Sequence, residues 1–150
     1  MIEGLLIKKI NQYHDDRGWL GEVYRQDEGD YRPAMAYISM TKPGVIRGPH
    51  EHKFQSDAFV FLGPGSFELH LWDGRDNSSS KGKYLKIEVG ENNPSLVIVP
   101  PGVVHGYKAI GDKDAYCLNL PDKLYKGENK LEEVDEIRWE EDPNSPYKIN

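Results

Sequence analysis

The sequence predicts an all-β fold, a sandwich or barrel of the jelly-roll type. Short segments of alternating apolar and polar residues recur along the 150 residues. Ten prolines and fifteen glycines are spread between these segments, as expected where strands are joined by turns. No part of the chain shows a convincing long helical period. The result is about nine strands with no long helix, a pattern typical of closed or double-sheet β architectures.

The N-terminal half contains four expected strands with turn signals between them. Apolar residues favour a strand over 5–10, and an Asp-Asp-Arg-Gly turn at 15–18 precedes a strand over 19–24. A third strand over 34–40 ends at Thr-Lys-Pro-Gly, and a fourth over 57–62 ends at Gly-Pro-Gly. Between them, 44–52 looks like a strand or strand edge bounded by glycine and proline.

The C-terminal half contains five more expected strands. The first, 66–72, alternates most cleanly, with Phe67, Leu69 and Leu71 on one face. After a polar loop the others cover 83–89, 95–99, 104–109 and 115–120. From about residue 121 the pattern weakens, and we expect an irregular C-terminal segment within a single domain spanning 1–150.

Composition narrows the class of protein. A formal net charge of −6 argues against a general nucleic-acid surface, although a few local Arg or Lys residues would suffice for a small anionic ligand. The only cysteine is Cys117, so an intrachain disulfide is excluded. The chain shows neither a signal-peptide pattern nor an apolar run of the ~20 residues that a membrane helix needs. We therefore expect a cytoplasmic protein with no membrane partner.

Three histidines form the most informative pattern. His50 and His52 lie two residues apart, and His105 follows a Pro-Pro-Gly turn about fifty positions later. Alternate residues of a strand share a face, so the first two point the same way and the third can join them from another strand. Three imidazoles in one pocket suit either metal binding or proton transfer.

The surrounding motifs resemble those of the cupins. Gly44 followed by His50-x-His52 resembles the first cupin motif, and Pro100-x-Gly102-x-x-His105 resembles the second. Within the cupins, the chain is similar to the dTDP-4-dehydrorhamnose 3,5-epimerase family over roughly residues 3 to 142. The matching segments occur in the family's order and are 16–22, 45–50, 72–78, 98–107, Tyr125 and 137–139.

This resemblance implies a cupin barrel, that is, a double-stranded β-helix or jelly roll, which forms a homodimer. It implies an isomerase that epimerises C3, C5 or both in a nucleotide-linked 4-keto-6-deoxy sugar, most often dTDP-linked, during carbohydrate biosynthesis. It further implies a reaction by proton abstraction through an enolate, without a cofactor or metal.

The resemblance and the residue chemistry together suggest roles for particular side chains. His50 is the candidate base, and His105 would orient the ketone or the base. Tyr107, in phase with His105, is the first candidate for the acid, ahead of Tyr37 and Tyr116. The candidate substrate-binding residues are Arg17, Glu22, Arg47, His52, Arg75 and Asn119. The guanidinium groups among them can bind phosphate oxygens through two parallel hydrogen bonds.

The chain also departs from the family pattern, which leaves alternatives open. The family's catalytic tyrosine falls on Asn119 and its lysine on about Asp57. The aspartate that partners the catalytic histidine lies in a C-terminal extension without a counterpart here. The His-x-His pattern that includes His52 looks more like that of the sugar-nucleotide 3,4-ketoisomerases, so ketoisomerisation is one alternative. Another is a metal-binding cupin, in which the ligands would be His50, His52, Asp57 and His105. The third is a sugar-nucleotide-binding protein without activity.

Overall fold

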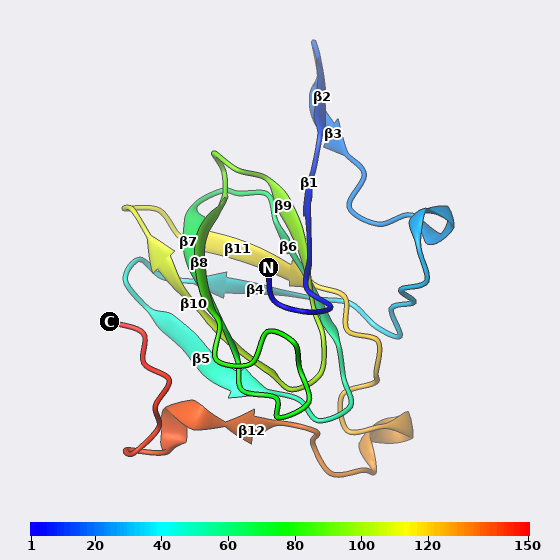
Figure 1. Ribbon diagram of the computed structural model, residues 1–150. Coiled ribbons are helices and arrows are strands. Elements are labelled where there is room, and N and C mark those ends of the chain that lie inside the picture. The colour runs from blue at the N-terminus through cyan, green and yellow to red at the C-terminus, as the bar shows by residue number, and fades with distance from the viewer.

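The computed structural model describes residues 1–150 and is built almost entirely from β-strands (Figure 1). Two five-stranded antiparallel sheets form the barrel, with strand orders β1-β9-β6-β11-β4 and β12-β5-β10-β7-β8. A separate two-stranded sheet pairs β2 with β3. Because neighbouring strands in each sheet are mostly far apart in sequence, the connections cross between the sheets, as in the expected jelly roll.

The strands have the following bounds: β1 Leu6–Lys9, β2 Gln12–Asp15, β3 Gly18–Gly21, β4 Tyr37–Thr41, β5 Ile46–Glu51, β6 Asp57–Phe61, β7 Ser66–Asp73, β8 Tyr84–Gly90, β9 Ser95–Val99, β10 Val103–Ile110, β11 Ala115–Asn119 and β12 Ile137–Arg138. Three single turns of 3₁₀ helix are present, η1 Gln26–Glu28, η2 Glu128–Lys130 and η3 Trp139–Glu141. None of these helical turns is long and apolar enough to cross a lipid bilayer.

Most expected strands are present, with ends shifted by a few residues. Two expectations were wrong near the N-terminus. The strand expected over 19–24 ends at Gly21, and residues 12–15, for which no strand was expected, form β2 and pair with β3. The 15–18 turn therefore joins a short hairpin, which projects away from the barrel (Figure 1).

The core lies between the inner faces of the two sheets. The alternation predicted on β7 is confirmed, because Phe67, Leu69 and Leu71 are fully buried and pack with Phe61 and Val97. Each buried side chain of this size stabilises the fold by roughly 1.5–3 kcal/mol. These contacts hold the two sheets face to face and so fix the positions of the site residues at one end of the barrel.

Residues 121–141, here called the C-terminal segment, run along that end of the barrel (Figure 1). As expected, the segment is mostly irregular, with only single helical turns and the two-residue strand β12. β12 pairs with β5, so that Ile137 lies opposite Glu51 and Arg138 opposite His50. This pairing brings an acidic stretch of chain to the histidine cluster.

Candidate active site

His50 and His105 meet because their strands are neighbours in the second sheet. β5 and β10 are antiparallel, and the two histidines are direct partners in the register. Their rings lie edge to face with centroids 4.6 Å apart. The ladder is irregular between His105 and Tyr107, which indicates a bulge at the point where the imidazoles converge.

A glycine allows this close approach. Gly48 has φ +79°, a conformation that side-chain-bearing residues rarely adopt. A Cβ atom there would lie 2.9 Å from the His105 carbonyl oxygen and 3.1 Å from Nδ1 of His50. Gly48 is therefore needed both for the backbone turn and for the position of the His50 ring.

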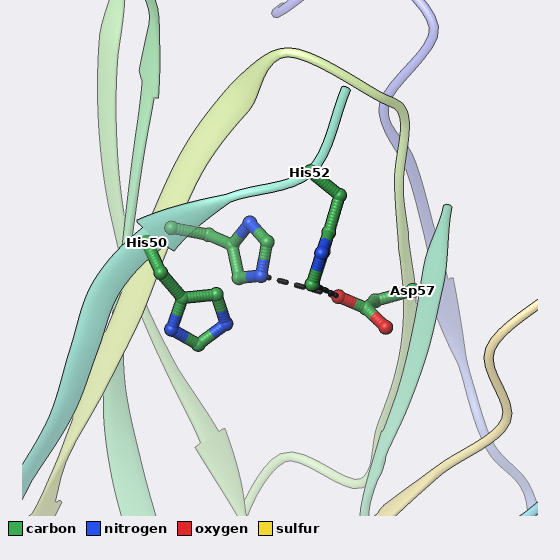
Figure 2. Close-up of side chains that lie close together, drawn as sticks. His50, His52 and Asp57 are labelled. Atoms are coloured by element: carbon green, nitrogen blue, oxygen red, sulfur yellow. Dashed lines mark ion pairs between the residues drawn. The ribbon is translucent and has the colours of Figure 1, made fainter. Parts of the chain in front are cut away.

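His52 and Asp57 complete the cluster from two directions (Figure 2). His52 follows β5 immediately and shares the face of His50, with ring centroids 5.5 Å apart. Asp57 is the first residue of β6 in the opposite sheet. Its Oδ2 atom lies 3.1 Å from Nε2 of His52 and 3.3 Å from Nε2 of His105. One buried carboxylate oxygen thus faces two imidazoles.

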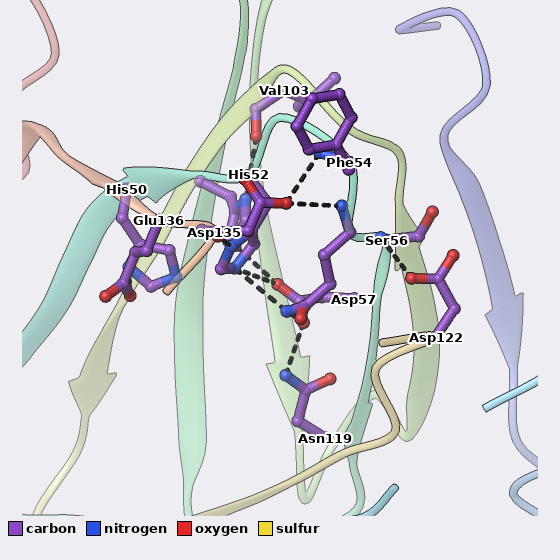
Figure 3. Close-up of polar contacts among 12 residues, drawn as sticks. His50, His52, Phe54, Ser56, Asp57, Val103, Asn119, Asp122, Asp135 and Glu136 are labelled. Atoms are coloured by element: carbon purple, nitrogen blue, oxygen red, sulfur yellow. Dashed lines mark hydrogen bonds and ion pairs between the residues drawn. The ribbon is translucent and has the colours of Figure 1, made fainter. Parts of the chain in front are cut away.

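Asp135 of the C-terminal segment fixes the His52 loop (Figure 3). Its carboxylate accepts hydrogen bonds of 2.8–3.0 Å from the backbone N–H groups of Lys53, Phe54 and Gln55. Its backbone carbonyl contacts Nδ1 of His52. Since a carbonyl only accepts, Nδ1 carries a proton. Both ring nitrogens of His52 therefore face acceptors, which favours the imidazolium form.

The other oxygen of Asp57 is held by two amides. Oδ1 accepts from Nδ2 of Asn119 at 2.9 Å and from Nε2 of Gln55 at 3.0 Å. The same Asn119 Nδ2 atom also donates to the Tyr37 hydroxyl at 2.9 Å. A continuous polar chain thus runs from His52 through Asp57 and Asn119 to Tyr37.

Burial and neighbouring charges shift the pKa values of His50 and His52 in opposite directions. Burial, reinforced by the neighbouring His105 and His52, lowers the pKa of His50 to about 2. For His52, burial acts in the same direction, but the hydrogen bond and charge of Asp57 outweigh it and raise the pKa to about 8. Burial alone would raise the pKa of Asp57, yet the adjacent imidazoles of His105 and His52 hold it well below its usual range. At neutral pH His50 is a free base beside a cationic His52.

His105 leaves one nitrogen without a hydrogen bond. Its Nδ1 atom donates to the Val103 carbonyl at 2.9 Å, while Nε2 is buried and has only the 3.3 Å ion-pair contact with Asp57. One donor atom from each of His50, His52, Asp57 and His105 lies within 4.8 Å of the others. Three nitrogens and a carboxylate oxygen at this spacing also form a donor set suitable for a divalent transition metal.

Two of these residues, His50 and His52, line a cavity of about 710 Å³. Its walls come from both sheets and the C-terminal segment, and they include the side chains of Tyr37, Arg47, His50 and His52. This volume suits a ligand of nucleotide-sugar size, because small-molecule sites commonly measure 300–1,000 Å³.

The cavity includes some of the predicted binding residues and not others. Arg47 lines it, with Nε bonded to Thr41 Oγ1 at 2.8 Å. Arg17 lies on the β2–β3 turn and pairs with Asp15, and it is not among the cavity residues. Glu22 pairs with Arg25 outside the cavity.

Arg75 forms hydrogen bonds with residues of its own protomer. Its Nε atom lies 2.8 Å from the buried Asp73 carboxylate, and its Nη2 atom donates to the Glu3 carbonyl at 2.7 Å. Asp73 also accepts from Ser78 and Ser80. Arg75 therefore ties the N-terminal segment to the loop between β7 and β8.

The two predicted residues nearest the barrel core are almost inaccessible. Tyr107 is 5% exposed, and its ring packs against Phe59, Phe61 and Phe67. Asn119 is 2% exposed and lies behind Asp57. Tyr107 still contributes to the cavity wall, whereas Asn119 is not among the cavity residues and supports Asp57 from behind.

Glu136 is a neighbour of His50 that the sequence did not predict. Its Oε1 atom lies 3.9 Å from Nδ1 of His50 (Figure 3). Its Oε2 atom accepts a hydrogen bond from Nε of Arg138 at 2.8 Å. The sequence led us to expect no acid partner for His50. Glu136 lies in an acidic stretch without periodicity, and only the adjacent Ile137-x-Trp139 landmark could have indicated it.

The site can therefore support proton transfer next to a polarised oxygen. It offers an unprotonated imidazole with a carboxylate behind it, and beside that a cationic imidazole fixed by Asp57. A base together with nearby positive charge meets the needs of a reaction that forms an enolate.

The sequence is similar to those of several known proteins. The family model for dTDP-4-dehydrorhamnose 3,5-epimerase matches residues 1–144. A probable low-salt glycan biosynthesis epimerase of Haloferax volcanii is 36% identical, with 88% of this chain and 86% of the relative aligned. A spore coat polysaccharide biosynthesis protein of Bacillus subtilis is 33% identical, with coverage of 95% and 93%.

Solved structures show the same fold. A dTDP sugar isomerase from Desulfovibrio desulfuricans superposes with a TM-score of 0.84 at 23% identity, over 98% of this chain and 91% of the other. A 4-keto-6-deoxy sugar epimerase of novobiocin biosynthesis from Streptomyces spheroides gives 0.74 at 26% identity, over 83% and 66%. The expected cupin jelly roll is confirmed, and the chain belongs to the dTDP-4-dehydrorhamnose 3,5-epimerase family of sugar-nucleotide isomerases.

Proposed function

We propose that the protein epimerises C3, C5 or both in a dTDP-linked 4-keto-6-deoxy sugar, as a step in glycan or polysaccharide biosynthesis. Family membership supports the substrate class. The single observation that carries the proposal is His50, a partly buried neutral imidazole that lines the cavity with the Glu136 carboxylate behind it.

In the proposed reaction, His50 removes the proton from the carbon next to the ketone. The C–H electrons form the enolate, and the imidazole becomes cationic. Glu136, 3.9 Å from Nδ1, then faces a positive ring, which stabilises the protonated base and keeps the ring oriented. A carboxylate from the C-terminal segment thus supports the base in this chain.

The enolate oxygen needs positive charge, which the family pattern would draw from a lysine. Here the carboxylate of Asp57 occupies that region of the sequence, so the charge must come from elsewhere. His52, held between the Asp135 carbonyl and Asp57, supplies a fixed imidazolium. His105 adds a second imidazole aimed at the same carboxylate oxygen. We assign oxyanion stabilisation to His52, which lines the cavity.

The diphosphate of the substrate would bind at the mouth of the cavity. Arg47 reaches it from β5, and three further cations of the C-terminal segment line the same space, namely Lys123, Lys126 and Arg138. Guanidinium and ammonium groups are the usual partners of phosphate oxygens.

The test is incubation with dTDP-4-keto-6-deoxyglucose in heavy water, followed by proton NMR. The proposal predicts deuterium at C3, C5 or both, together with inverted product. A carbonyl that moves to C3 would instead identify a 3,4-ketoisomerase, the alternative suggested by His52. Binding of the nucleotide sugar without exchange would leave only a binding protein.

A metal-dependent activity is the second candidate, favoured by the unpaired Nε2 of His105 within the four-residue donor set. A metal ion would supply Lewis-acid chemistry. It would be held by His50, His52, Asp57 and His105, and an imidazole engaged in this way could not also act as the base. The two candidates are separated by assaying tag-free protein after dialysis against EDTA. The epimerase proposal predicts full activity, whereas loss that Mn²⁺, Fe²⁺, Ni²⁺ or Zn²⁺ restores would favour the metal.

We also propose a homodimer, in which the outer face of β4 and β11 meets a second copy. Alternation turns Ile38 and Met40 outward, and they are 67% and 40% exposed beside Tyr116. An apolar face of this kind commonly marks an interface. A second copy is also the means by which Arg17, Glu22 and Arg75 could reach a substrate.

Light scattering after size-exclusion chromatography tests the dimer. Ile38→Asp is expected to give a monomer, while Leu131→Asp, at an even more exposed apolar residue outside this face, should not. A wild-type monomer at micromolar concentration would refute the proposal. The expected cytoplasmic location also remains part of this proposal.

A further inference from the structure

Tyr37 occupies a special position relative to Asn119, the residue where the family's tyrosine is missing. Tyr37 lies on β4, the edge strand of the first sheet, and is the direct register partner of Asn119 on β11. Its side chain lines the cavity, and the residue is 47% exposed. A phenol is therefore present one strand away from the expected place.

The chemistry of Asp57 fixes the orientation of the Asn119 amide. Nδ2 lies 2.9 Å from Asp57 Oδ1, while the Asn119 Oδ1 atom has no partner. An ionised carboxylate only accepts hydrogen bonds, so the amide must turn its NH₂ group toward it. The second N–H of that group points to the Tyr37 oxygen, also at 2.9 Å.

This orientation leaves the Tyr37 hydroxyl hydrogen unused. Because Asn119 donates, the phenol oxygen accepts, and the structure shows no other hydrogen bond to that oxygen. The O–H bond is therefore available to a ligand in the cavity. Burial raises the pKa of Tyr37, although the bond from Asn119 counteracts this, so the phenol is protonated at neutral pH.

Tyr37 and His50 also approach the cavity from different sheets. His50 is on β5 of the second sheet and Tyr37 on β4 of the first, and both line the same cavity. Inversion of a carbon requires that the proton leave from one face and return to the other. Because His50 and Tyr37 lie on opposing sheets, they can reach opposite faces of a carbon bound between them.

We propose that Tyr37 is the catalytic acid of the epimerisation and that Asn119 positions its hydroxyl. The inference rests on the proposed epimerase function. After His50 has taken the proton, the enolate carbon takes the Tyr37 hydroxyl hydrogen on its other face and the ketone reforms. The phenolate regains a proton from water through the open cavity, and His50 releases its proton to water. No electrons are exchanged with another reagent.

The experiment compares Tyr37→Phe with wild type in heavy water, again using dTDP-4-keto-6-deoxyglucose. We expect the variant to incorporate deuterium into unconverted substrate, because His50 still forms the enolate and can return a proton to the same face. Formation of inverted product should fall by about 10²-fold or more. Asn119→Ala should likewise retain deuterium exchange and lose inverted product, but with a smaller loss. Tyr84→Phe, at the far edge of the second sheet, is the matched control and should leave both rates unchanged.

Each other outcome overturns the inference in a recognisable way. Inverted product at the wild-type rate from Tyr37→Phe shows that another acid acts, and loss of product in Tyr107→Phe would identify it. Loss of both exchange and inversion in folded Tyr37→Phe would assign Tyr37 to binding or to the first step. Absence of exchange in wild type would refute the proposed function itself, and the acid assignment with it.

Discussion

His50 and His105 are direct partners across β5 and β10, and their rings lie 4.6 Å apart. The first is a strand residue next to a glycine turn, and the second follows a Pro-Gly turn some fifty residues later. Their meeting depends on a close backbone approach at Gly48. The site is thus specified as much by the backbone between the histidines as by the histidines themselves.

Gly48→Ala is therefore expected to be damaging for two reasons. The new residue must hold φ +79°, which costs about 1–3 kcal/mol, and its methyl group would contact the His105 carbonyl oxygen and the His50 ring. Gly82 offers a matched control, because its φ is +82° and a Cβ atom there meets nothing within 4 Å.

Urea unfolding and turnover should be measured for both variants. We predict that both lose stability but that only Gly48→Ala loses most of its exchange activity. Equal activity in the two variants would show that the His50 position does not depend on Gly48.

Glu136→Gln tests whether the carboxylate near His50 supports the base. The amide keeps the shape but cannot stabilise a cationic ring, so kcat should fall about tenfold or more while KM changes little. Glu128→Gln, an exposed change in the same segment, is the control. A pH–rate profile adds a readout that a structural role would not move, since loss of the charge should make His50 harder to protonate. An unchanged kcat and profile would remove Glu136 from the mechanism.

Arg75 offers a separate prediction about stability. The Arg75 guanidinium, with Ser78 and Ser80, holds the pKa of the buried Asp73 carboxyl well below its usual range. A depressed carboxyl pKa contributes stability that is present above about pH 4 and is lost as the pH falls below it. Arg75→Ala should therefore lower stability at pH 7 and flatten this acid dependence.

Arg75→Ala also distinguishes a structural role of Arg75 from a role in substrate binding. If Arg75 acts only within its own protomer, KM for the nucleotide sugar should stay at the wild-type value at a temperature where the variant is folded. A large rise in KM would instead support the role in substrate binding that the motif suggested.

Much of the site was predictable from local sequence patterns. Strand alternation correctly grouped His50 with His52 and allowed His105 to join them, and the motif order indicated Asp57. These features depend on a period of two and on turns, which a sequence displays directly. The same reasoning predicted a substrate-binding role for Arg75. An Asp-x-Arg loop has the same sequence whether the arginine binds a phosphate or, as here, pairs with Asp73.

The rest depended on pairings that no local pattern encodes. Glu136 and Asp135 reach the cluster only because β12 joins β5 across more than eighty residues. Tyr37 reaches it because β4 pairs with β11 in the register that sets it against Asn119. Acidic runs and lone tyrosines carry no signal of such contacts.

The central claim is that His50 is the base, and His50→Gln in heavy water tests it most directly. Glutamine keeps a polar side chain of similar reach but cannot accept a proton at neutral pH. We predict that folded His50→Gln, judged by an unchanged circular dichroism spectrum, loses deuterium incorporation at C3 and C5 of dTDP-4-keto-6-deoxyglucose by about 10²-fold or more. Deuterium incorporation at the wild-type rate in that variant would contradict the account.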